Sequence, residues 1–205
     1  MTRLLLATRN AKKLDELRRI LGAAGVEGLD VVGLADVTPF PETPETEPTF
    51  EGNALAKARD AAKATGLSSV ADDSGLTVDA LNGMPGVLSA RWAGRHGDDP
   101  ANLELVLGQL ADVPDERRGA AFVCAAALVT PAGAETVVRG EWAGRLTRQP
   151  RGRNGFGYDP IFQPAGEHRT SAELEPAEKD TLSHRGRALR ELLPRLRELA
   201  AGAIA

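Results

Sequence analysis

Apolar and polar positions follow one another along the chain in blocks that predict strands and helices. Residues 3–7 form a short apolar run, which predicts a buried first strand, and a polar turn at residues 8–10 follows it. Residues 11–21 then repeat apolar side chains at helical spacing, with Gly22 or Gly25 as the expected stop. A strand that passes through a polar turn into a helix favours anion binding, because the first N–H groups of the helix are exposed.

The rest of the chain continues this mixture of strands and helices, which predicts an α/β or α+β sheet with helices on its faces. A segment rich in proline and glutamate, residues 38–48, is expected to be an irregular surface loop that carries Glu45. Helices are predicted over 50–65, ended by Gly66, and from an Asp99-Pro100 start to about residue 110. Long strands over 119–130 and 135–147 should form a hairpin, and a short strand is predicted over 158–162. A last helix should follow Ser183, and Pro194 should kink or interrupt it.

Two neighbouring carboxylates, Asp72 and Asp73, stand between the apolar stretches 69–71 and 76–79. An ionised carboxylate is costly to desolvate, so a pair at the end of a buried strand needs a cation, and a divalent metal with oxygen ligands is the first candidate. Ser74 and Gly75 come directly after the pair and predict a tight turn. If the strand continued instead, the two carboxylates would face opposite sides of the sheet, and one alone could face a given ligand.

Composition narrows the class of protein. The chain has 205 residues, 42% of them hydrophobic, and a net charge of −4, so it can bury a core and lacks the basic excess of a general nucleic-acid binder. Its one cysteine, Cys124, lies in an apolar run, which excludes an intrachain disulfide and favours a buried small side chain in a reduced, cytoplasmic setting. No apolar run approaches the length that spans a membrane.

Three further groups of residues carry candidate chemistry. Residues 8–13 could hold a phosphate at the helix start, although this is not a Walker A loop and the motif is weak alone. In residues 154–160, Phe156 and Tyr158 offer ring faces to a base and Asp159 a hydrogen-bond acceptor; the alternative is a glycine-rich turn with core aromatics. Lys179, with the Ser183-His184-Arg185 segment at a helix start, supplies donors that suit a purine carbonyl.

Together these segments resemble the non-canonical purine nucleoside triphosphate pyrophosphatases, the inosine/xanthosine triphosphatase family. Six segments occur in the family's order and make the match specific, although each is weak alone. They are Ala7-Thr8-Arg9-Asn10-Ala11-Lys12-Lys13, Thr49-Phe50-Glu51-Gly52-Asn53-Ala54 with Lys57-Ala58, Ala71-Asp72-Asp73-Ser74-Gly75-Leu76, Pro85-Gly86-Val87 with Ser89-Ala90-Arg91, Gly155-Phe156-Gly157-Tyr158-Asp159-Pro160, and Ser183-His184-Arg185.

The resemblance implies an α/β fold: a long twisted mixed sheet with flanking helices that form two lobes around a nucleotide cleft, in a single domain over residues 1–205. It implies a cytoplasmic homodimer that uses Mg²⁺ to hydrolyse ITP, dITP and XTP to the monophosphate and pyrophosphate, with no nucleic-acid polymer or membrane as partner. Asp73 would be the proton acceptor and a metal ligand, and Glu45 the second metal carboxylate. The implied substrate-binding residues are Thr8, Arg9, Asn10, Ala11, Lys12, Lys13, Ser74, Phe156, Gly157, Tyr158, Asp159, Lys179, His184 and Arg185.

Two departures from the family pattern stand out. Glu47-Pro48 replaces the usual glycine near Glu45, so this loop could sit differently, and Asn154 replaces a frequent glycine beside the expected base site. Two other functions stay open at this point. One is a Maf-like nucleotide pyrophosphatase with another base preference, against which the Ser183-His184-Arg185 segment argues. The other is a nucleotide-binding module without catalysis.

Overall fold

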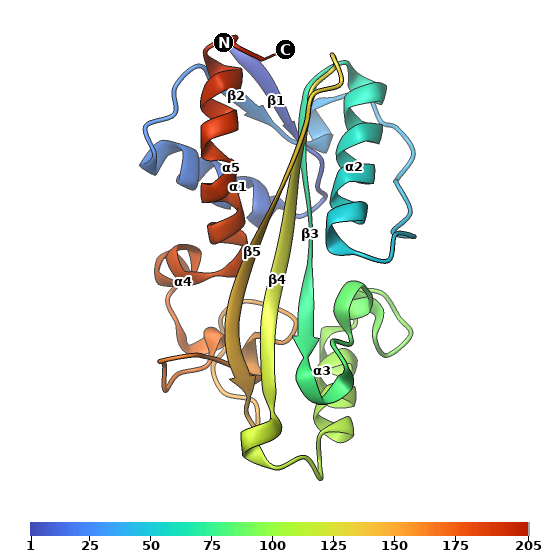
Figure 1. Ribbon diagram of the computed structural model, residues 1–205, viewed down its shortest axis with the longest axis vertical. Coiled ribbons are helices and arrows are strands. Elements are labelled where there is room, and N and C mark those ends of the chain that lie inside the picture. The colour runs from blue at the N-terminus through green and yellow to red at the C-terminus, as the bar shows by residue number, and fades with distance from the viewer. Residues whose placement is uncertain (205) are drawn as a thin grey trace. The chain divides into compact units, whose positions relative to one another are not determined.

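The computed structural model describes residues 1–204, without the side chains of Ala11 and Lys12. A six-stranded sheet has the order β2-β1-β3-β4-β5-β6 (Figure 1). β1 pairs in parallel with β2 and β3, and β5 pairs with β6 in antiparallel fashion, so the sheet is mixed and the predicted α/β class is confirmed. The strands are β1 Thr2–Leu6, β2 Leu29–Val32, β3 Ser68–Val78, β4 Gly119–Val129, β5 Glu135–Leu146 and β6 Phe162–Pro164.

Five α-helices accompany the sheet within the described residues. The observed bounds of α2 are the predicted ones. The helix starts after Thr49, whose side chain accepts a hydrogen bond from the Gly52 N–H, and it ends at Gly66, which has a left-handed backbone (φ 68°). No helix in this part of the chain is both long and apolar enough to cross a membrane. The helices are α1 Ala11–Ala23, α2 Phe50–Thr65, α3 Asp99–Gln109, α4 Pro176–Leu182 and α5 His184–Ala200.

The chain forms two compact units, each built from separate stretches of sequence. The first comprises residues 1–73, 124–140 and 185–205, and the second comprises residues 74–123 and 141–184. In the first unit, α1 and α5 lie on one face of the strands and α2 on the other (Figure 1). Alternation along β1 explains this arrangement: Leu4 and Leu6 pack in the core with α1 and α5, whereas Leu5 packs with Ala61 of α2.

The second unit has its own hydrophobic core. Leu76 and Val78 of β3 pack there with Leu103, Val106 and Leu110 from α3 and the residue after it. Three aromatic rings cluster within this core, because Phe162 lies 4.6 Å from Phe122 and 5.5 Å from Trp142 between ring centroids. The remaining buried members are Ala120, Leu146, Tyr158, Ile161 and Leu174.

The tight turn predicted at residues 72–75 is wrong. β3 runs without a break from Ser68 to Val78, so both aspartates lie inside a strand. Gly75 serves close packing instead of a turn: a Cβ at this position would collide with the Ser89 hydroxyl and the Gly86 carbonyl. Ser89 is fixed there because its hydroxyl accepts a hydrogen bond from the Leu76 N–H (2.8 Å) and donates one to the Gly86 carbonyl (2.7 Å).

Other differences concern the ends of elements. The N-cap of α3 is Asp98, whose carboxylate accepts from the Ala101 N–H, so the helix begins one residue earlier than an Asp99 cap would place it. Residues 159–161 form a 3₁₀ turn, and the short strand predicted over 158–162 is β6, shifted along the chain. α5 continues through Pro194 without interruption. The short elements β2 and α4 were not predicted.

Candidate functional site

Asp72 and Asp73 are the last residues of β3 that belong to the first unit, and they lie on opposite faces of this strand. Strand alternation directs Asp72 towards α1 and α5 and Asp73 towards α2. Both are buried, with about 6% and 7% of their surface exposed, so each needs its own compensating cations. The strand continues through both residues, so the two carboxylates face opposite sides of the sheet, as the sequence predicted for a continuous strand.

The Asp72 carboxylate is held by two cations. Its Oδ2 accepts from Lys13 Nζ of α1 at 2.7 Å and from Arg185 Nε of α5 at 3.3 Å. Arg185 also reaches a second carboxylate, with its Nη1 3.4 Å from Oε2 of the buried Glu16. Burial alone would raise the pKa of Asp72, but Lys13 and Arg185 outweigh it and hold this pKa well below its usual range. Asp72 is therefore an anion that fixes Lys13.

Asp73 shares one lysine with Glu45. Lys57 Nζ of α2 lies 2.5 Å from Glu45 Oε1 and 3.2 Å from Asp73 Oδ1. The other oxygen of Asp73 accepts from Asn53 Nδ2 at 3.0 Å. Burial raises the pKa of Asp73, and Glu45 adds to this, while Lys57 and Asn53 lower it in part. The structure thus brings together the two carboxylates that the family resemblance implies as metal ligands.

The loop that carries Glu45 is fastened to the start of α2. The Asn53 side chain accepts from the Glu47 N–H at 3.0 Å, so one amide binds both the loop and Asp73. Gly52 allows the close approach, because a Cβ there would stand 2.7 Å from the Glu47 Cβ. The Glu47-Pro48 departure from the family pattern therefore does not carry Glu45 away from Asp73.

The residues predicted to hold phosphate lie at the start of α1. The Thr8 hydroxyl accepts from the Asn10 N–H at 3.2 Å, which shapes the turn, and the exposed Arg9 forms an ion pair with Glu42 at 2.9 Å. The predicted roles of the Ala11 and Lys12 side chains concern atoms outside the described part of the structure. Lys13, also of this set, is joined to the acidic pair through Asp72.

A separate cluster in the second unit centres on the buried Asp159. Its Oδ2 accepts from Lys179 Nζ at 2.5 Å and from the Phe156 N–H at 2.8 Å, and its Oδ1 accepts from the Ser171 hydroxyl at 2.7 Å. Phe156 is 45% exposed, and Lys179 Nζ lies 5.5 Å from the centre of its ring. An exposed ring beside a fixed ammonium is a surface on which a planar base can stack.

Two of the four remaining predicted residues of this unit, Tyr158 and His184, are buried. The Tyr158 ring lies in the core and its hydroxyl donates to the Ser89 carbonyl at 2.8 Å, which favours the packing interpretation for this residue. The Gly157 N–H donates to Asp99 Oδ2 at 2.8 Å. His184 stacks on Phe122, with ring centroids 4.9 Å apart. Ser74 follows Asp73 within β3.

Comparison with known proteins identifies the family to which the chain belongs. Residues 4–195 match the model of the Ham1 family. The chain belongs to the Ham1 family. It is 68% identical to a dITP/XTP pyrophosphatase of Mycobacterium tuberculosis over 202 aligned residues, and the alignment covers 98% of each protein. The family predicted from the six collinear segments is thereby confirmed.

Solved structures of Ham1-family proteins share the fold. The crystal structure of a nucleoside-triphosphatase / dITP/XTP pyrophosphatase from Mycobacterium abscessus is 64% identical with a TM-score of 0.80, and it covers 96% of this chain and 100% of its own. A HAM1 protein from Coxiella burnetii is 44% identical with a TM-score of 0.87, covering 97% of this chain and 100% of its own.

Three residues that organise the site in this Ham1-family chain had no role assigned from the sequence, although Asn53 and Lys57 stand in one of the six matching segments. Asn53 and Lys57 are four residues apart on α2 and so share one helix face, a spacing that could have revealed them together. Lys57 is also one of only five lysines among 25 basic residues. Glu16 gave no such signal, because from the sequence its position on α1 is indistinguishable from an exposed helix face. In the structure, Arg185 of α5 pairs with it.

The site offers an oxygen donor set for a divalent cation. Asp73 and Glu45 converge on one point, now marked by the Lys57 ammonium. Among the described residues, no group of three or more His, Cys, Asp or Glu side chains is arranged to hold a metal. Two carboxylates suit Mg²⁺ nonetheless, because this ion keeps several waters and commonly takes its remaining ligands from substrate phosphates.

Proposed function

We propose that this chain hydrolyses non-canonical purine nucleoside triphosphates, ITP, dITP and XTP, to the monophosphate and pyrophosphate. The observation that carries the proposal is its 68% identity, over 98% of both chains, to a protein named dITP/XTP pyrophosphatase. The paired carboxylates on a single lysine and the exposed ring beside Lys179 supply chemistry that this reaction requires. The match to the Ham1 family over residues 4–195 disfavours the Maf-like alternative.

In the proposed reaction, a water oxygen forms a bond to the α-phosphorus and the bond from this phosphorus to the α–β bridging oxygen breaks. The electron pair of that bond leaves with pyrophosphate. Asp73 accepts the proton of the water, while Asn53 and Lys57 hold its carboxylate in place. Lys13, fixed by Asp72, stabilises the negative charge that gathers on the leaving pyrophosphate.

Asp73 and Glu45 would hold Mg²⁺, and Lys57 would yield part of its contact with them. The ion, when bound, polarises the phosphoryl oxygens and neutralises polyphosphate charge. The exposed Phe156 ring would stack on the base, and Lys179 would donate to the 6-keto oxygen that ITP and XTP share. Adenine carries an amino group at this position, so a donor there disfavours ATP. We also propose that the chain acts as a homodimer in the cytoplasm, as its family resemblance implies.

Release of pyrophosphate from a panel of triphosphates tests the function. The purified chain with Mg²⁺ should hydrolyse ITP, dITP and XTP much faster than ATP, GTP, CTP and UTP. Asp73→Asn should remove this turnover, whereas Asp30→Asn, a matched change at an exposed aspartate of the first unit, should not. Equal rates on the standard nucleotides would contradict the substrate class. Binding of ITP without any turnover would support the non-catalytic module instead.

A further inference from the structure

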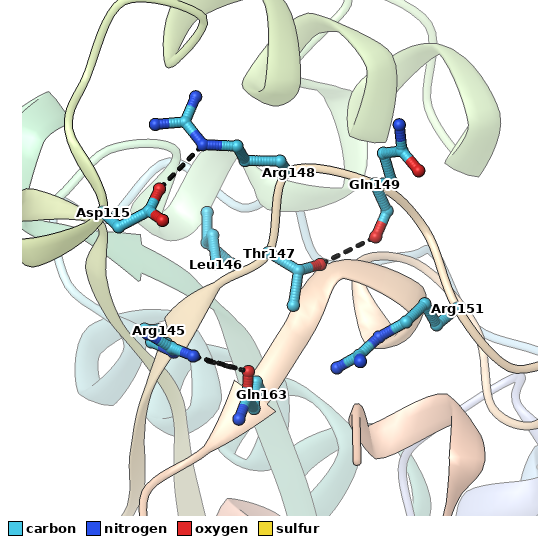
Figure 2. Close-up of a pocket in the computed structure, with 8 residues that line it drawn as sticks. All are labelled: Asp115, Arg145, Leu146, Thr147, Arg148, Gln149, Arg151 and Gln163. Atoms are coloured by element: carbon cyan, nitrogen blue, oxygen red, sulfur yellow. Dashed lines mark hydrogen bonds and ion pairs between the residues drawn. The ribbon is translucent and has the colours of Figure 1, made fainter. Parts of the chain in front are cut away.

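A pocket lined by arginines lies wholly within the second unit and shares no residue with the two clusters described above. Its volume is about 310 Å³. The lining includes three arginines and one carboxylate, so the formal charge of the pocket lining is positive. The lining residues are Asp115, Arg145, Leu146, Thr147, Arg148, Gln149, Arg151 and Gln163 (Figure 2).

The polar groups of this pocket are held in place by hydrogen bonds. Nε and Nη2 of Arg145 both donate to one oxygen, Oε1 of Gln163, at 3.3 and 3.2 Å. Arg151 donates from Nη2 to the His168 carbonyl at 3.0 Å, and its Nε lies 3.7 Å from Oε2 of Glu173, which is not a lining residue. Figure 2 shows the guanidinium groups of Arg145 and Arg151 directed towards Gln163 from its two sides. A guanidinium has five N–H donors, so both arginines retain donor capacity beyond these bonds.

A fourth cation stands behind the pocket wall. Arg118 is only 2% exposed, and it donates to the carbonyls of Leu146 and Thr147, both lining residues, at 3.0 Å each. Its third bond goes to the Leu110 carbonyl at 2.7 Å, so its hydrogen-bond acceptors are neutral. Burial lowers the pKa of Arg118, and the like charge of Arg148 lowers it further. An anion in the pocket would relieve this accumulation of positive charge.

The single carboxylate of the lining does not neutralise the whole pocket. Asp115 binds Arg148 Nε at 2.7 Å, at the exposed edge, and that arginine also points to the carbonyls of Ala111 and Val113. Figure 2 shows this pair turned away from Arg151 and Gln163. Arg145 and Arg151, with the Thr147 hydroxyl and the Gln163 amide, form the cationic part, in which Glu173, outside the lining, offsets part of the charge of Arg151.

We propose that this pocket binds a small oxyanion of the phosphate class, with Arg145 and Arg151 as its principal ligands. Guanidinium forks match the oxygen geometry of phosphates in a way that a point charge does not. The pocket volume exceeds that of a single carboxylate group and accommodates a di- or monophosphate. Inorganic pyrophosphate is the natural probe, because its several oxygens can meet both arginines together.

Calorimetric titration with inorganic pyrophosphate in metal-free buffer tests the proposal. Arg145→Gln/Arg151→Gln should weaken binding by about tenfold or more. Arg59→Gln/Arg195→Gln removes the same charge from exposed, ion-paired arginines elsewhere and should leave binding unchanged. Arg145→Lys/Arg151→Lys keeps the charge without the fork, and should bind with intermediate affinity.

Hydrogen exchange locates the bound anion. Pyrophosphate should slow amide exchange in peptides covering residues 144–151 of the wild-type chain, and the Gln double variant should lose this protection. Circular dichroism and thermal unfolding confirm that each variant is folded. Unchanged affinity in the Gln variant, an equal loss in the control variant, or protection confined to residues 8–13 would each overturn the proposal. None of these readouts depends on triphosphate hydrolysis, so the proposed function can fail while this site stands.

Discussion

Asp72 and Asp73 are adjacent in β3, yet their carboxylates bind lysines of different helices on opposite faces of the sheet. Asp72 is 2.7 Å from Lys13 of α1, and Asp73 is 3.2 Å from Lys57 of α2. The pair therefore combines two separate tasks. In the proposed function, Asp72 would fix the lysine that meets the substrate's phosphates, and Asp73 would join Glu45 where a metal and a water bind.

Asp73→Asn should lower kcat for ITP hydrolysis by about 10²–10⁴-fold, because an amide cannot accept the proton of the attacking water. The Asn oxygen can still accept from Lys57, but its amide nitrogen then faces the Asn53 Nδ2 donor and one hydrogen bond is lost, so circular dichroism should accompany the kinetics to show that the variant is folded. Steady-state kinetics with saturating Mg²⁺ measures the change. Retention of the wild-type kcat would remove Asp73 from its proposed role.

Asp72→Asn should act mainly on stability. It leaves Lys13 and the buried Arg185 without the carboxylate that both bind, and breaking a buried ion pair costs about 3–5 kcal/mol. Urea unfolding should show this loss, and Asp30→Asn, at an exposed aspartate, should show about 1 kcal/mol or less. Equal stability of the two variants would mean that Lys13 and Arg185 do not depend on Asp72.

Titration with Mg²⁺ alone examines the metal site without turnover. Glu45→Gln should weaken Mg²⁺ binding by about tenfold or more, since it removes one of two charged oxygen ligands. Lys57→Met should strengthen it, because the ammonium now occupies the point where the two carboxylates converge. A Lys57→Met variant that binds Mg²⁺ no better than wild type would show that lysine and metal do not compete.

The sequence predicted the sheet class, the long hairpin, α2 to the residue, and the family, because these depend on periodicity and on ordered motifs. It failed at residues 72–75, where Ser-Gly reads as a turn until the packing of Gly75 against Ser89 is known. It also missed Glu16, whose partner Arg185 is distant in sequence. Local patterns cannot report which side chains a distant helix will cover, and much of this site is made of such pairs.

Cys124 should resist thiol reagents in the folded chain. Its side chain is fully buried, and burial together with the nearby Asp72 carboxylate raises the pKa of the thiol well above its ordinary value. A colorimetric disulfide reagent should therefore react with no thiol in native buffer and with one per chain in denaturant. Rapid reaction of the native protein would contradict the burial of this strand.

Phe156→Ala should raise KM for ITP more than it lowers kcat. The ring is exposed and linked to Asp159 through its own backbone N–H, so its removal leaves the loop intact and deletes the stacking surface. Base–aromatic stacking contributes about 1–3 kcal/mol, which corresponds to a roughly 5- to 150-fold rise in KM. Leu105→Ala, at an exposed apolar position of α3, is the matched control and should keep the wild-type KM. If Phe156→Ala also keeps it, the base binds elsewhere, and the Lys179–Asp159 pair is structural.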